Sequence, residues 1–77
     1  MIKFTRHAKG RMRLYDINIE DVKLVIDQGE RELLSEGKIS TTLPVEKKSK
    51  YPLRVVFRQG EDSTTIITAY PLKRGRE

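Results

Sequence analysis

Two side chains near the start of the chain, His7 and Arg11, are of the types that act on phosphate groups. They are four residues apart, so in a helix they lie side by side on one face. An imidazole group, whose ordinary pKa is about 6.5, takes up or releases a proton near neutral pH. A guanidinium group holds two anionic oxygens at once. The surrounding segment, 1–13, has five basic residues and no acid, so the pair is a candidate phosphate site.

Cleavage of RNA without a metal needs several kinds of group, and the sequence offers a candidate for each. The reaction needs a base for the 2′-hydroxyl, an acid for the departing 5′-oxygen and positive charge on the transition state. His7 is the candidate for proton transfer, and Arg11 and Arg54 are the candidates for holding the phosphate. Tyr70 or Thr68 would donate a hydrogen bond or stack on a base. Strand alternation alone does not establish that Arg54 and Thr68 face the same side.

These residues also have ordinary structural interpretations. A histidine on a helix often only hydrogen-bonds a backbone carbonyl. Arginines on the outward side of a strand, here Arg54 and Arg58, commonly pair with nearby acids, and Tyr70 suits the edge of a core. Further candidates for contact with a nucleic-acid backbone are Arg58 and three loop lysines, Lys47, Lys48 and Lys50. A short lysine run is equally typical of a solvated loop.

Composition limits the classes of function. With 77 residues the chain is expected to form one domain, 1–77, in which 72–77 are a mobile basic tail. It has no cysteine and one histidine, which excludes a disulfide framework and a zinc site built from thiolates or several histidines. We expect no metal and no cofactor. No apolar run is long enough for a membrane span and no signal peptide is recognisable, so the expected location is the cytoplasm.

The net charge of +5 is unevenly distributed. Basic blocks at 1–13 and 37–58 flank an acidic block at 16–36. If folding joins the basic blocks, one face would suit phosphate and another a basic partner. The chain has no GxxxxGK[ST], GxGxxG or GxSxG motif, which argues against the corresponding nucleotide-binding and hydrolase sites.

Two helices are predicted in the first 29 residues. Apolar side chains recur at helical spacing from Phe4 to Tyr15, and Thr5 is placed to cap the first helix. Gly10 weakens that helix by about 1 kcal/mol relative to alanine. Asn18 is the expected cap of the second helix, which Gly29 would end.

Four strands are predicted after Gly29, over 31–35, 38–45, 51–58 and 63–70, with turns at 36–37 and 59–62. In the third strand one side carries apolar residues and the other carries Arg54 and Arg58. In the fourth, Ile66, Thr68 and Tyr70 fall on one side by simple alternation. The prediction is an α+β fold in which two N-terminal helices cover one side of a four-stranded antiparallel sheet.

Five short segments carry a resemblance to a known family: 4–8, the Arg11-Met12 pair, 19–22, 53–56 and 66–70. Together they resemble a small prokaryotic domain family of unknown function related to the RelE-like and BrnT-like toxins. The resemblance implies a RelE/barnase-like fold and a metal-independent ribonuclease toxin neutralised by an antitoxin. The positions it points to are His7, Arg11, Arg54, Thr68 and Tyr70. The family usually has arginine followed by glycine where this chain has Tyr15-Asp16; if that arginine helps to bind phosphate, this chain lacks the activity it supports.

The expected function is therefore that of a RelE-like RNA endonuclease, the toxin of a toxin–antitoxin pair, with RNA and an antitoxin protein as partners. Two alternatives stay open. One is a noncatalytic module that binds nucleic acid or protein through the same basic surface. The other is an inactive toxin relative that keeps only its partner interface. The sequence does not indicate the oligomeric state.

Overall fold

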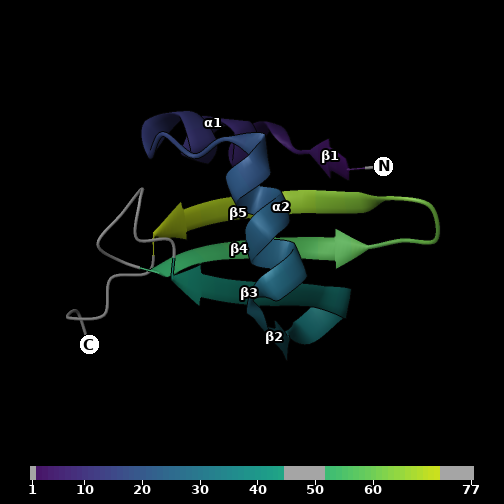
Figure 1. Cartoon of the computed structure of the whole chain (residues 1–77). Coiled ribbons are helices and arrows are strands. Elements are labelled where there is room, and N and C mark those ends of the chain that lie inside the picture. Colours follow the sequence, from purple (N-terminus) through teal and green to yellow (C-terminus); the bar gives the residue numbers. More distant parts are fainter. Residues whose placement is uncertain (1, 45–51, 72–77) are drawn as a thin grey trace.

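The computed structural model, which describes residues 2–44 and 52–71, is an α+β fold (Figure 1). Two helices and five strands are present in the described part of the chain. In chain order these elements are β1 (Ile2–Phe4), α1 (Arg6–Leu14), α2 (Ile19–Gln28), β2 (Glu30–Leu33), a 3-10 turn η1 (Ser35–Gly37), β3 (Lys38–Pro44), β4 (Pro52–Gln59) and β5 (Thr64–Pro71). Neither helix is long and apolar enough to cross a membrane.

The sheet has the strand order β1-β5-β4-β3-β2. The four strands that the sequence predicted pair in an antiparallel manner, as expected. The prediction of a purely antiparallel four-stranded sheet is wrong at one edge, because β1 adds a fifth strand parallel to β5. This strand has only three residues, too few to show an alternating pattern. Phe4, which the helical spacing assigned to the first helix, belongs to it instead.

Thr5 caps α1 as predicted and also attaches the helix to β5. Its hydroxyl accepts a hydrogen bond from the backbone N–H of Ala8 at 3.0 Å. The same hydroxyl donates to the carbonyl of Ile67 at 3.1 Å, and the Thr5 N–H donates to the carbonyl of Ile66 at 3.1 Å. One residue therefore sets both where α1 begins and which part of β5 it lies beside.

The end of α1 is a Schellman turn. Asp16 has a φ of 57°, in the left-handed region, and the N–H of Ile17 donates to the carbonyl of Met12 at 2.8 Å. Ile17 is buried in the core. Glycine is the preferred residue at such a position, whereas this chain has aspartate there.

Both predicted boundaries of α2 are confirmed. Asn18 and Asp21 form a reciprocal capping box, and Gly29 follows the last helical turn. At Gly29 the chain passes close to β3. A Cβ atom there would lie 2.6 Å from the carbonyl oxygen of Val25 and 2.7 Å from that of Thr42. Close backbone approach, with no need for a positive φ, accounts for glycine at this position.

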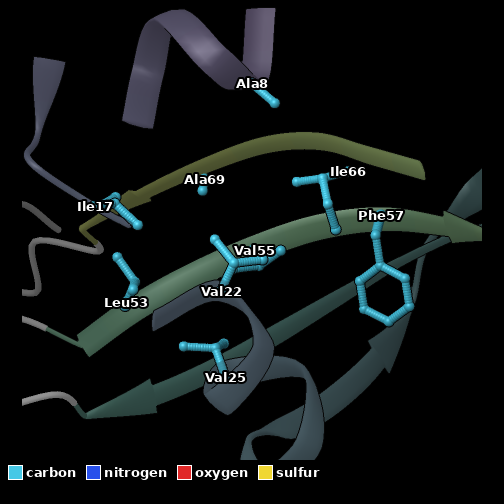
Figure 2. Packing of buried hydrophobic residues seen from close by; sticks show 9 residues of the cluster. All are labelled: Ala8, Ile17, Val22, Val25, Leu53, Val55, Phe57, Ile66 and Ala69. Atoms are coloured by element: carbon cyan, nitrogen blue, oxygen red, sulfur yellow. The ribbon is translucent and has the colours of Figure 1, made fainter. Parts of the chain in front are cut away.

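The hydrophobic core lies between the helices and one face of the sheet (Figure 2). α1 contacts β5, while α2 crosses β3 and β4 (Figure 1). As the alternation predicted, Leu53, Val55 and Phe57 of β4 point into this core. The other buried members of the cluster are Ala8, Ile17, Val22, Val25, Ile66 and Ala69.

A bulge in β5 changes which side chains face the core. The register between β4 and β5 shifts between Val56 and Phe57, which pair with Thr68 and Ile66. Ile67 is consequently an extra residue, opposite no partner of its own. The prediction that Ile66, Thr68 and Tyr70 share one side is wrong for this reason, because Ile66 is fully buried in the core while Thr68 lies on the opposite face.

Candidate functional site

An open groove of about 340 Å³ lies between α1 and the second half of β5. His7, Arg11 and Tyr15 line it from the helix, and Thr68 and Tyr70 line it from the strand. The groove exists because β1 pairs only with residues 64–66 of β5, which leaves the rest of that edge beside α1. Its size falls in the range of pockets that hold small ligands.

Four of the residues predicted from the sequence therefore come together in one groove. Local spacing places His7 and Arg11 on the same face of α1. Thr68 and Tyr70 reach the groove through the bulge, which turns both away from the core. The helix and the strand are held in this relation by the two hydrogen bonds from Thr5 to the backbone of the bulge.

His7 and Arg11 contact each other directly. The Nε of Arg11 lies 3.4 Å from the Nε2 of His7 and donates a long hydrogen bond to it on the exposed surface. A guanidinium group has no acceptor atom, so the Nε2 of His7 is the acceptor in this contact. The contact occupies one of the five N–H donors of the guanidinium. The remaining N–H donors of the Arg11 guanidinium can bind an anion.

Arg54 lies beside the groove and not in it. In the sheet register it is opposite Tyr70 on β5 and opposite Thr42 on β3, on the face away from the helices. Its guanidinium leans toward β3, where Nη2 donates to the hydroxyl of Ser40 at 3.4 Å. The Nε of Arg54 is buried and has no hydrogen-bond partner among the described residues, which is a costly arrangement unless a ligand or water satisfies it.

The other predicted basic residues are not part of the groove as described. Arg58 lies at the far end of β4, where its Nη2 donates to the carbonyl of Glu36 at 3.3 Å. Lys47, Lys48 and Lys50 lie outside the described residues, as does the predicted tail, 72–77.

Tyr15 is a groove residue that the sequence reasoning missed. Its helical spacing placed it on one stripe with Phe4, Ala8 and Met12, but Tyr15 is 40% exposed and lines the groove. The signal that would have found it is its position four residues after Arg11 and eight after His7. These three residues form a second stripe along α1.

The groove is basic. None of the described residues that line it is acidic, and α1 also carries Arg6, Lys9 and Arg13 on its exposed surface. Such a field attracts anions and weakens as salt increases. Among the residues that the structure describes, no three His, Asp or Glu side chains gather in a way that would hold a metal ion.

These observations define a small α+β domain with a basic groove between its first helix and the last strand of a mixed sheet. The chain belongs to the family described as "Domain of unknown function (DUF4258)", whose model matches residues 4–71. The match runs from the end of β1 to the end of β5, so it includes every residue that lines the groove. No curated protein matches the sequence.

Proposed function

We propose that the protein is a metal-independent RNA endonuclease of the RelE-like kind, the toxin of a toxin–antitoxin pair, and that the groove is its active site. The observation that supports this most strongly is the groove itself. It gathers an imidazole, a guanidinium and three hydroxyl groups from opposite ends of the chain. These groups match what cleavage of an RNA phosphodiester requires.

In the proposed reaction the 2′-oxygen of the RNA attacks the neighbouring phosphorus. A 2′-O–P bond forms, the P–O5′ bond breaks, and the products carry a 2′,3′-cyclic phosphate and a 5′-hydroxyl. Arg11 holds the phosphate oxygens. Either His7 accepts the proton of the 2′-hydroxyl while water gives a proton to the departing 5′-oxygen, or His7 donates that proton while water accepts the one from the 2′-hydroxyl. Thr68 and Tyr70 donate hydrogen bonds to the phosphate.

The contact between Arg11 and His7 has a role in this scheme. In the structure the Nε2 lone pair of His7 accepts a hydrogen bond from Arg11, so it is not available to a substrate hydroxyl. A bound phosphate competes for the guanidinium, because a charge-assisted bond is stronger than a long one to imidazole. Substrate binding thereby releases Nε2 for proton transfer.

Arg54 is the proposed second phosphate-binding residue. Its neighbour in the register, Tyr70, lines the groove, and directly opposite residues in a sheet have Cβ atoms about 5 Å apart. A change of rotamer from Ser40 toward β5 would bring the guanidinium to the groove and give its buried Nε a partner. A RelE/barnase-like arrangement of the two helices and the sheet is part of this proposal.

The test is to incubate the protein with single-stranded RNA in the presence of EDTA. We expect products that end in a 2′,3′-cyclic phosphate, and no cleavage where the attacking nucleotide is a 2′-deoxynucleotide. His7→Ala and Arg11→Ala should each lower the cleavage rate by about 100-fold or more. Arg6→Ala, which removes an exposed arginine of the same helix outside the groove, is the matched control.

Induced expression tests the same proposal in cells. The wild type should arrest growth, His7→Ala should relieve the arrest, and an antitoxin should copurify as the product of a small neighbouring gene. A wild type that leaves both growth and RNA intact contradicts the endonuclease proposal.

A noncatalytic nucleic-acid-binding module is the second candidate. The observation in its favour is that His7 is exposed and its Nε2 is occupied by Arg11. In this case His7→Ala leaves RNA affinity within about twofold, while replacing Lys47, Lys48 and Lys50 together flattens the salt dependence of binding. Binding of a protein partner without any affinity for RNA would instead indicate an inactive relative.

A further inference from the structure

Tyr15 presents an aromatic ring at the end of α1 that the core does not use. It follows the last helical residue as the C-cap, is 40% exposed and is not a member of the buried cluster. Its side chain lines the groove beside Arg11, and the strand side of the same groove carries a second tyrosine, Tyr70. An aromatic ring next to a guanidinium is a combination that serves base and phosphate together.

The spacing along α1 suits one nucleotide. Helical rise is about 1.5 Å per residue, so Arg11 and Tyr15 are about 6 Å apart along the axis. That separation is comparable to the reach from a phosphate group across its sugar to the base. His7 lies one helical turn before Arg11, on the side opposite to Tyr15. With a phosphate at Arg11, the 2′-hydroxyl or the leaving 5′-oxygen would lie near His7.

We propose that Tyr15 is a base-stacking residue, and that the ligand of the groove is single-stranded RNA bound with one phosphate at Arg11 and an adjacent base against the Tyr15 ring. This rests on the proposed function in taking RNA as the ligand, and adds how the RNA is recognised. Because a duplex keeps its bases stacked, this contact selects single strands. The lining residues that the structure describes include no acid, which suits a phosphate and disfavours a basic peptide.

The test compares two fluorescein-labelled probes that the protein cannot cleave. The first is a hexanucleotide of 2′-O-methyluridine, and the second has the same backbone with abasic central positions. Wild type should bind the first about tenfold more tightly, within the range that one stacked base contributes. Tyr15→Leu should abolish this preference and Tyr15→Phe should retain it. Leu14→Ala, which alters a 65% exposed neighbour outside the groove, should also retain it.

Arg11→Gln separates failure of this inference from failure of the proposed function. It should weaken binding of both probes equally and make binding less dependent on salt. Two results would show that the stacking role is wrong while RNA remains the ligand. In both, Arg11→Gln weakens binding of both probes; in the first Tyr15→Leu keeps the preference for the probe with bases, and in the second the wild type has no such preference. If wild type binds neither probe at low salt, both proposals are wrong. A circular dichroism spectrum and urea midpoint close to wild type show that each variant is folded.

Discussion

Replacing Thr5 by valine tests how α1 is attached to the sheet. Valine keeps the shape of the side chain but removes the hydroxyl that accepts from the Ala8 N–H and donates to the Ile67 carbonyl. Loss of a helix cap costs about 1 kcal/mol. Leaving the part-buried Ile67 carbonyl without this donor costs about 1 kcal/mol more. We therefore expect Thr5→Val to lower the free energy of unfolding by about 2 kcal/mol.

Urea denaturation followed by circular dichroism measures this loss. For a small domain with a slope of about 1 kcal/mol per M, the midpoint should fall by about 2 M. Thr5→Ser, which keeps the hydroxyl, should stay within about 0.5 kcal/mol of wild type. If the groove binds single-stranded RNA as proposed, that affinity should also fall in Thr5→Val, because the two walls of the groove are held together at this residue. A valine variant as stable as the serine variant would refute the reasoning.

Three further substitutions test the backbone, each by the same urea measurement. Gly10→Ala should raise the free energy of unfolding by about 1 kcal/mol, since nothing lies within 4 Å of an added Cβ atom; a loss of stability would show that this turn of α1 is not helical. Asp16→Gly should raise it by about 0.5 to 1 kcal/mol by relieving the positive φ of 57°, and no gain would argue against the Schellman turn. Gly29→Ala should lower it by about 1 to 3 kcal/mol, because the added methyl group meets two backbone carbonyl oxygens; an unchanged midpoint would contradict the close approach of α2 to β3.

The features that the sequence predicted correctly are set by residues close to one another in the chain. Asn18 and Gly29 bound α2 because capping uses residues within one turn. His7 and Arg11 were predicted to be neighbours because helical spacing alone brings them together, and the structure shows them in contact. The inward side of β4 followed from the period of a strand.

Tertiary structure decided how these elements meet. Thr5 and Ile67 are 62 residues apart in sequence, and no local pattern reports a hydrogen bond between them. The extra residue in β5 places Thr68 and Tyr70 away from the core, against the alternation read from the sequence. The parallel pairing of β1 with β5 ends at Ile66, so the rest of that edge of β5 lies beside α1 and forms one wall of the groove.

The side chains of the site show the same division. The sequence by itself determined which chemical groups are present and that two of them share a helix face. Only the tertiary structure decided that Tyr15 lines the groove and that the Arg54 guanidinium leans toward Ser40. The physical reason is that local spacing orients a side chain relative to its own element, whereas what it contacts depends on the register and packing of segments distant in the chain.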